Sequence, residues 1–448
     1  MQRHWGGAQY DAIVVGAGLS GLAAAIRLRQ QGKSVLVLEK TDQPGGRARK
    51  VSFDTLEFEV GCNQLGKSIH AMMDELGVRH DFIPKKNRFV FSNKILEFPL
   101  TTDSPDTLPE LSDLFSNPEN LDKTLEELTY NLQPTRANVL RAPFAYFLMR
   151  PSEKIDFQLA RNFLINDYGY EDPRIPAGGM SALIDSMVKA FQSLGGVIQC
   201  DASYEGFYLE DNLKMVMSKN KHGQSSVSHT HCIVSSVDGW NRYPGNAERS
   251  LAIGSMLFEM NADFHYPEDV HTIVFVPDDI DAWLRAVHQG ILDDQFAFHC
   301  FINQPLSTES NTPCKISAYL FMPHNHECNQ SDREKIEARM ISVMNQHLPG
   351  FQASIVKQHF FPPDAYLQSL GFESVVVPRI PPKEFSLSCY DAEQDIYYIG
   401  NAVNAEHEQH IEGALLSAKK AVDLIINNTF VCKLKLNEVF SDGKYRQY

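Results

Sequence analysis

Residues 10–49 constrain the fold more than any other stretch of the chain. Residues 12–15 form a short, largely β-branched apolar run, which is typical of a buried parallel strand. Gly16, Gly18 and Gly21 follow with GxGxxG spacing. At a strand-to-helix turn these glycines permit, in order, the tight bend, the close approach of a pyrophosphate and the close packing of helix on strand. The stretch therefore predicts a Rossmann-like dinucleotide-binding unit.

The residues after the glycines extend this prediction. The helix continues to Gly32, and its first turn, with Leu19 and Ser20, would point backbone N–H groups at the pyrophosphate. Residues 35–38 predict a second buried strand that ends at Glu39. A carboxylate about 20 residues beyond the glycines can accept hydrogen bonds from both hydroxyls of an adenosine ribose. Glu39 and the adjacent Lys40 are therefore candidate cofactor ligands.

A second glycine motif indicates which dinucleotide is bound. Gly45, Gly46 and Arg47 follow in a loop, and the whole stretch resembles the fingerprint of the flavin-containing amine oxidase and phytoene desaturase superfamily. This superfamily includes protoporphyrinogen oxidases, carotenoid desaturases and amine or amino-acid oxidases. The resemblance implies FAD, with the GGR loop along its diphosphate and ribityl chain. NAD is disfavoured because no second glycine fingerprint follows, and the sequence shows no candidate for covalent flavin attachment, so we expect non-covalent FAD.

Two later segments resemble other parts of the family's flavin site. Residues 51–60 predict a strand, and Gly61 after it matches a family loop that faces the flavin. Residues 176–180 (PAGGM) precede a predicted helix over 181–194 and a strand over 197–200. In the family the following strands supply a residue whose backbone binds the adenine edge, and by spacing that residue is Tyr204. Residues 212–219 and 231–236 would complete a small covering sheet, with residues 219–229 as its solvated tip.

The third segment lies near the carboxyl end. Residues 396–399 predict a buried strand that is followed by Gly400 and Asn401, and a helix is expected over residues 411–426. This resembles the family's C-terminal flavin box, in which Asn401 replaces the usual aspartate. Asn can still donate to phosphate or ribityl oxygens. The resemblance places Ile411 and Ala414 at the flavin, where the start of the helix would stabilise negative charge on its pyrimidine end.

The rest of the chain predicts a substrate domain interleaved with the first. A hairpin over residues 89–98, a helical region before residue 170, apolar or alternating strands and a helix over 334–347 indicate a mixed sheet with helices. We expect α/β architecture, with a Rossmann-like FAD-binding domain and an α+β substrate-binding domain. The FAD-binding domain is expected over residues 1–85, 171–237 and 364–448. The substrate-binding domain is expected over residues 86–170 and 238–363.

Composition limits the possible partners and compartment. A formal net charge of −15 over 448 residues argues against a nucleic-acid surface. No apolar run is long enough to span a bilayer or to act as a signal peptide, and the eight cysteines form no CxxC motif. We therefore expect a cytoplasmic enzyme with reduced thiols. His324, His326 and Cys328 have a suggestive HxHxC spacing, but we expect no metal because they fall in a loop between a strand and a helix.

The sequence leaves three hypotheses for the function of the protein. The first hypothesis is an FAD-dependent oxidase or dehydrogenase, similar to phytoene desaturases, that removes hydride from a small apolar or ring-containing substrate. The second is an amine or amino-acid oxidase. The third, from another class, is a non-catalytic protein resembling the Rab GDP-dissociation inhibitors. His410 replaces one of the two aromatic rings that guide an amine in amine oxidases. It could serve as a general base or donor, or simply pack.

Other features stay open at the level of sequence. Alternation does not show whether His299 faces a substrate cavity. The electron acceptor, oxygen or a quinone, is not indicated. In some relatives with lipid-soluble substrates a helix docks on a membrane, and the sequence does not decide whether a helix within residues 101–170 does so here.

Overall fold

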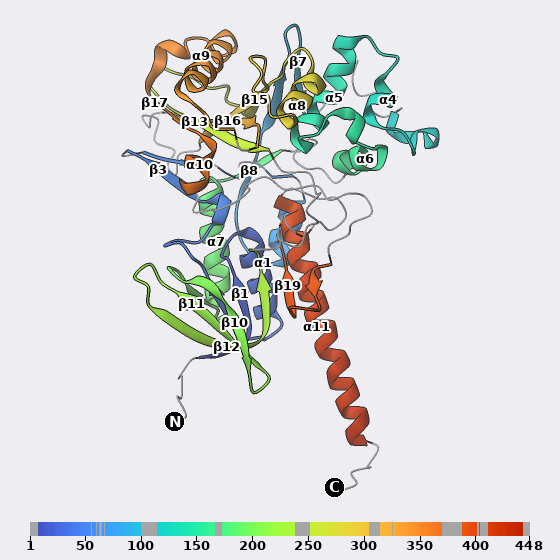
Figure 1. The fold of residues 1–448 in the computed structure, drawn as a ribbon, viewed down its shortest axis with the longest axis vertical. Coiled ribbons are helices and arrows are strands. Elements are labelled where there is room, and N and C mark those ends of the chain that lie inside the picture. Colours follow the sequence, from blue (N-terminus) through green and yellow to red (C-terminus); the bar gives the residue numbers. More distant parts are fainter. Residues whose placement is uncertain are drawn as a thin grey trace. The chain divides into compact units, whose positions relative to one another are not determined.

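The structure is a computed structural model (Figure 1). The structure describes residues 8–54, 56–59, 61, 65–66, 68–99, 114–165, 173–237, 251–303, 314–324, 326–369, 388–400, 403 and 411–441. The chain divides into two compact units. Unit 1 comprises Met1–Pro44, Met187–Ala247 and Pro381–Tyr448, and unit 2 comprises Gly45–Ser186 and Glu248–Ile380.

Unit 1 is built on one eight-stranded sheet within the described residues. Its main path runs β10-β11-β12-β1-β2-β9. Off this path, β19 pairs with the end of β12, and β18 pairs with β19. β1 pairs in parallel with β2 and with β12, whereas β10, β11 and β12 form an antiparallel meander. The strands are β1 Gln9–Val15, β2 Val35–Leu38, β9 Val197–Gln199, β10 Ser203–Glu210, β11 Leu213–Lys219, β12 Ser225–Ser235, β18 Tyr390–Asp391 and β19 Ile396–Tyr398.

Two helices pack against each other within unit 1, α1 (Leu19–Gln30) and α11 (Ile411–Ser441). Helix α1 is buried on nearly all sides and consists largely of small and aliphatic residues, among them Ala24 and Ile26, both fully buried. The predicted strand over residues 35–38 is confirmed residue for residue by β2. The predicted helix from residue 411 is also present, but it continues 15 residues beyond the predicted end at 426, to Ser441.

One prediction for unit 1 is only partly confirmed. Residues 212–219 and 231–236 were expected to complete a small covering sheet, and β11 does pair with β12, but residues 231–235 form the end of the long strand β12, which also lies directly beside β1. The buried residues Ile233 and Val234 favour this central position because both faces of a parallel sheet are covered. The hairpin tip is correspondingly shorter than residues 219–229, since β11 extends to Lys219 and β12 starts at Ser225.

Unit 2 contains a seven-stranded sheet in the described part of the chain, with the order β17-β13-β16-β15-β14-β6-β7. Its strands are β6 Lys86–Val90, β7 Ile95–Phe98, β13 Ala252–Met260, β14 Val270–Phe275, β15 Phe298–Asn303, β16 Lys315–Met322 and β17 Ile355–Phe361. Two small pairs accompany it, β3 Lys50–Phe53 with β4 Leu56–Glu59, and β5 Phe82–Pro84 with β8 Arg174–Pro176. The single strand expected over residues 51–60 is thus a hairpin, because Asp54 adopts a left-handed conformation (φ 54°) that turns the chain.

Unit 2 also contains helices, of which α5 and α9 pack against the sheet through Tyr146 and His347. They are α2 Ile69–Glu75, α4 Leu125–Thr129, α5 Pro134–Leu148, α6 Phe157–Ile165, α7 Met180–Ser193 (whose end belongs to unit 1), α8 Ile280–His288, α9 Gln330–His347 and α10 Pro363–Ser369, with short 3₁₀ turns η1 Gly46–Ala48, η2 Pro118–Asn120, η3 Ser152–Lys154 and η5 Gln352–Ser354. Helix α9 starts four residues before the predicted 334 because Asn329 and Asp332 form a capping box. Its end at His347 agrees with the prediction.

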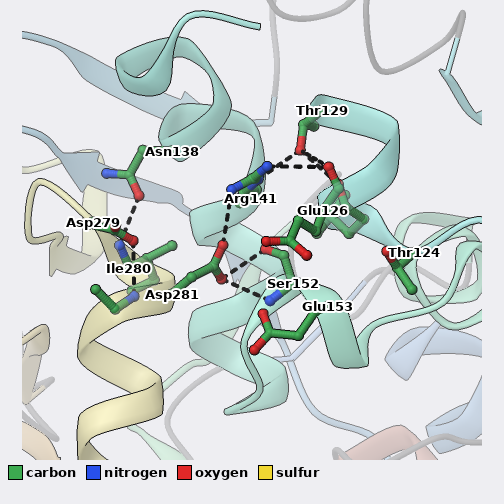
Figure 2. A network of polar contacts seen from close by, with 12 residues as sticks. Thr124, Glu126, Thr129, Asn138, Arg141, Ser152, Glu153, Asp279, Ile280 and Asp281 are labelled. Carbon is green, nitrogen blue, oxygen red and sulfur yellow. Dashed lines mark hydrogen bonds and ion pairs between the residues drawn. The ribbon is translucent and has the colours of Figure 1, made fainter. Parts of the chain in front are cut away.

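A buried polar network ties α4, α5, η3 and α8 together (Figure 2). Asp281 accepts hydrogen bonds from the N–H and the hydroxyl of Ser152, both at 2.8 Å, and its other oxygen lies 3.2 Å from Arg141 Nη1. Arg141 also donates to the hydroxyl of Thr129 at 2.7 Å. Because the Asp281 side chain is 2% exposed, this ion pair is fully desolvated on the carboxylate side.

The boundaries of the two compact units differ from the boundaries of the two predicted domains. Residues 45–85 fall in unit 2, because the hairpin β3–β4 packs on β16 and because β5 pairs with β8. The assignment of each unit to cofactor or substrate stays a prediction. Among the described residues, no helix combines the length and apolar character needed to cross a bilayer.

Candidate active site

The glycine turn of unit 1 has the geometry that its spacing predicts. Gly16 adopts a positive φ of 95° directly after β1, and its N–H donates to the carbonyl of Leu38 at 2.8 Å. A Cβ atom on Gly21 would lie 1.9 Å from the Gly16 carbonyl oxygen, so only glycine fits there. Gly18 is the N-cap of α1, and no side chain caps this end. The first amides of the helix are therefore disposed to bind an anion.

Glu39 is held beside this turn by hydrogen bonds that the sequence did not indicate. Its Oε2 accepts the N–H of Ala17 at 2.8 Å, and its Oε1 accepts the N–H and hydroxyl of Thr41 at 3.0 and 2.8 Å. The side chain is 6% exposed. A carboxylate offers about four acceptor positions, so it can still receive a ribose hydroxyl. The neighbouring Lys40 is exposed.

The carboxyl ends of β1, β12 and β19 meet at one edge of the unit 1 sheet, where doubly wound folds bind their ligands. The hydroxyl of Ser236, just after β12, donates to the Val15 carbonyl at 2.8 Å and would lie 2.2 Å from a Cβ on Gly16. After β19, the N–H of Gly400 donates to the buried hydroxyl of Ser417 at 2.8 Å. The predicted segments around Gly16 and Gly400 are thus brought together, and Ser236 and Ser417 support them.

Gly400 also approaches the glycine-rich helix α1 directly. A Cβ on Gly400 would lie 3.2 Å from the hydroxyl oxygen of Ser20, a residue predicted to bind the cofactor. Leu19, also in this first turn, is buried. Ile411 and Ala414 are buried in the first turn of α11. Two predicted site residues, Asn401 and His410, lie outside the described residues.

Tyr204 lies near the start of the edge strand β10. Two residues earlier, the N–H of Ala202 donates to the carbonyl of Glu39 at 2.8 Å, so the backbone enters β10 beside the predicted ribose ligand. Tyr204 also lines a cavity of about 420 Å³ together with Phe207 and Lys214. A backbone contact from this segment is compatible with the structure, and it stays a prediction.

The GGR loop belongs to unit 2. Gly45 and Gly46 both have positive φ, 131° and 55°, and Arg47 lies in the 3₁₀ turn that follows. Gly61 rests against this loop, because a Cβ on Gly61 would lie 1.5 Å from the Arg47 carbonyl oxygen. Within unit 2, the two predicted flavin loops are therefore in direct backbone contact.

Glu59 anchors this pair of loops and was not identified from the sequence. Its buried carboxylate accepts the N–H of Ser181 at 3.2 Å at the start of α7, and it occupies the space that a Cβ on Gly179 would need. Its carbonyl accepts the hydroxyl of Ser317 at 2.8 Å. Burial raises the pKa of Glu59, although hydrogen bonds from the Ser181 and Met180 amides oppose the shift. A capping carboxylate two residues before Gly61 therefore holds that loop between α7 and β16.

His299 is buried on the unit 2 sheet in contact with α5. Its Nδ1 lies 2.7 Å from the hydroxyl of Tyr146, whose side chain has no exposed surface. Burial lowers the pKa of His299 to about 3 and raises the pKa of Tyr146 well above 10. Both groups are therefore uncharged at neutral pH. Tyr146 and Phe144 are both buried in the core of unit 2.

The HxHxC segment does not form a metal cluster in the described residues, where no group of three or more potential ligands is close enough to hold an ion. His326 instead contacts Asp332, with Nε2 3.1 Å from a carboxylate oxygen that also caps α9.

Together, the uncapped helix α1, the glycine turn and the fixed carboxylate define a Rossmann-like dinucleotide-binding unit. The family model that matches residues 14–76 is described as an NAD(P)-binding Rossmann-like domain. The chain is 23% identical to the phytoene desaturase (lycopene-forming) of Pseudescherichia vulneris, over 93% of this chain and 99% of the relative.

Solved structures share the fold over nearly the whole chain. An oxidoreductase from Methanosarcina mazei matches with a TM-score of 0.64 and 12% identity, covering 92% of this chain and 99% of that one. Cyclohexylamine oxidase from Brevibacterium oxydans matches with a TM-score of 0.62 and 15% identity, covering 94% and 99%. The matched domain and the long similarity to phytoene desaturases support the superfamily of flavin-containing amine oxidases and phytoene desaturases, and with it the function of an oxidoreductase. The matches give no support to the alternative resembling GDP-dissociation inhibitors.

Proposed function

We propose that the protein binds FAD non-covalently and uses it to remove hydride from a small, largely apolar substrate. The observation that carries this proposal is the uncapped N-terminus of α1 next to the carboxylate of Glu39. The amides of Gly18, Leu19 and Ser20 would hold the pyrophosphate, and Glu39 would accept a ribose hydroxyl. FAD, when bound, would accept a hydride from carbon, and loss of a proton from the neighbouring carbon or nitrogen leaves a C=C or C=N bond.

The chain's own residues bind and orient in this proposal. Gly45, Gly46 and Arg47 would lie along the diphosphate and ribityl chain, with Gly61 supporting them. Arg47 would supply a fixed planar cation for phosphate. Further proposed cofactor contacts come from Gly400, Asn401, Ile411, Ala414, Lys40 and the backbone of Tyr204.

A desaturase or dehydrogenase is the first choice because the long sequence matches are to phytoene desaturases, which cover 80% or more of this chain. The runner-up is an amine oxidase, which the structural similarity to cyclohexylamine oxidase favours. A substrate panel with anaerobic flavin reduction tests the choice. Reduction by neutral polyenes or ring compounds supports the first, whereas reduction by amines, with peroxide and ammonia released once oxygen is admitted, would establish the second. The acceptor is identified by adding oxygen or a quinone to the reduced protein and recording which of them reoxidises the flavin.

We also propose a role for His410 in the reaction, as a base or hydrogen-bond donor next to the start of α11. His410→Ala should then slow flavin reduction by substrate while leaving the spectrum of bound flavin nearly unaltered. Equal reduction rates in the variant and the wild type would assign His410 to packing.

A further inference from the structure

The open question of which way His299 faces is answered within unit 2. Strand pairing places His299 directly opposite Tyr319 of β16, so both side chains lie on the same face of the sheet. On that face Tyr319 packs in a cluster with Phe58 of β4. β4 is followed by Gly61, which rests on the carbonyl of Arg47. His299 therefore shares its face with the two loops proposed to contact flavin.

The opposite face is taken by helix α9. His347 at the end of α9 contacts Phe275, with ring centroids 5.8 Å apart, and Phe275 pairs with Phe298, the neighbour of His299 that points the other way. The face of His299 is covered elsewhere by α5 and α8, through Tyr146 and Trp283. The face of His299 thus lies between these helices and the β3–β4 hairpin, which leads into the loop of Gly61.

This face carries hydrogen-bonding groups but no charge near His299. The row of directly opposed residues through His299 consists of Phe361, Ser255, Tyr319, His299, Val274, Phe89 and Leu96. None of these is Asp, Glu, Lys or Arg. The next row toward the hairpin, with His359, Leu257, Ser317, Phe301, Thr272, Asn87 and Phe98, is also free of these residues. An ammonium group would be desolvated here without a counter-ion, which is costly.

The contact between Tyr146 and His299 fixes the imidazole. A phenol O–H is a better donor than an imidazole N–H, and an unprotonated imidazole nitrogen is a better acceptor than a phenol oxygen. The Tyr146 hydroxyl therefore donates to Nδ1, and the neutral ring carries its proton on Nε2. No described residue forms a hydrogen bond with Nε2. Tyr146 is itself held by stacking on Trp283, with centroids 6.2 Å apart.

We infer that His299 is the polar anchor of the substrate site: held by Tyr146, it donates an Nε2–H hydrogen bond to a neutral oxygen of an otherwise apolar substrate. This inference rests on the proposed function for the location of the site, and it narrows the substrate class. A hydroxyl or carbonyl on an isoprenoid or ring-containing molecule fits such an anchor. A protonated amine would find no carboxylate in these two rows of residues. A pure hydrocarbon would cover the Nε2–H of His299 and leave it without an acceptor, which is unfavourable.

Trp283 offers a probe that does not depend on flavin. With Trp5→Phe and Trp240→Phe, its indole becomes the sole tryptophan of the full chain. The ligands are farnesol and farnesene, an alcohol and its hydrocarbon counterpart, titrated while Trp283 fluorescence is recorded. His299→Phe removes the donor and keeps a planar ring, and His299→Gln restores an amide donor.

We expect the wild type to bind farnesol more tightly than farnesene, and His299→Phe to weaken farnesol binding about threefold to tenfold with farnesene unchanged. His299→Gln should recover part of the loss. Tyr146→Phe should act in the same direction but less, because the ring loses its orientation and keeps its N–H. Tyr266→Phe is the matched control. It removes another buried hydroxyl, which donates to the His271 carbonyl at 2.9 Å and lies near Cys300, a residue that points to the α9 face.

Two results would overturn the inference: unchanged alcohol preference in His299→Phe, or no response of Trp283 to either ligand. FAD content is measured on the same samples so that the two proposals can fail separately. If the protein binds FAD but shows no preference for the alcohol, the role of His299 is refuted and the proposed reaction is not. If the protein does not bind FAD but prefers the alcohol in a way that depends on His299, the proposed reaction is refuted and the role of His299 is not.

Discussion

Replacing His299 with phenylalanine should make the stability of unit 2 less dependent on pH between pH 7 and pH 5. Burial lowers the pKa of His299 to about 3, whereas a histidine in the unfolded chain titrates near 6.5. Below pH 6.5 the unfolded chain therefore binds a proton that the folded chain does not. The sign follows from this difference: stability is lost as the pH falls from about 6.5 toward 3, with a slope of about 1.4 kcal/mol per pH unit for each such histidine.

Between pH 7 and pH 5 this one residue accounts for about 2 kcal/mol of lost stability. His271, also fully buried with its pKa lowered to about 3, contributes a similar loss that the variant keeps. The groups around His299 are Tyr146 on α5, Tyr319 on β16 and His271 on β14, and none is charged in this range. At pH 7 the variant should be less stable by about 1–3 kcal/mol, because the buried Tyr146 hydroxyl loses its acceptor.

The assay is urea denaturation at pH 7, 6 and 5, followed by Trp283 fluorescence in the single-tryptophan chain. His222→Gln is the control, because this side chain is exposed at the tip between β11 and β12. The account requires the gap in unfolding free energy between wild type and His299→Phe to shrink by about 2 kcal/mol from pH 7 to pH 5. A gap independent of pH would show that the imidazole titrates normally and is not buried as described.

Other substitutions test the cofactor turn and the helical cover of unit 2. Glu39→Ala should weaken FAD binding by about 1–3 kcal/mol, since the ribose loses a charged acceptor and the turn loses its contact with the Ala17 amide; full flavin retention after dialysis would refute the assignment. Gly21→Ala should abolish FAD binding, because the new methyl group collides with the Gly16 carbonyl; an FAD dissociation constant equal to that of the wild type would contradict the turn geometry. Asp281→Ala should lower the free energy of unfolding by about 3–5 kcal/mol, because Arg141 is left without its buried partner (Figure 2). Thermal unfolding monitored by circular dichroism measures this loss, and an unchanged unfolding midpoint would show that the ion pair contributes nothing to stability.

The cofactor turn was predictable because its determinants are local. Three glycines, two short apolar strands and one acidic residue lie within a short stretch, and β2 begins and ends at the predicted residues. The role of Thr41 in holding Glu39 was missed, although a threonine two residues after a strand-ending acid is a common local hydrogen-bonding arrangement.

The sequence did not predict which segments far apart in the chain lie next to each other in the fold. The place of β12 beside β1 depends on parallel contacts between segments about 220 residues apart, such as Ile13 with Ile233, and apolar pattern alone does not choose a strand's neighbours. The hairpin of residues 50–59 depends on one left-handed residue, Asp54, in an otherwise continuous strand pattern. The partner of His299 lies 153 residues away in a helix, so alternation left its face undetermined.

The most direct test of the account is a titration of the purified apo-protein with FAD under equilibrium dialysis, with Gly21→Ala as the paired control. The account predicts one tightly held, non-covalent FAD for each wild-type chain, released intact on denaturation, and none for the variant. Wild-type protein that remains colourless at saturating FAD, or that binds it no better than the variant does, would contradict the flavin site at its foundation.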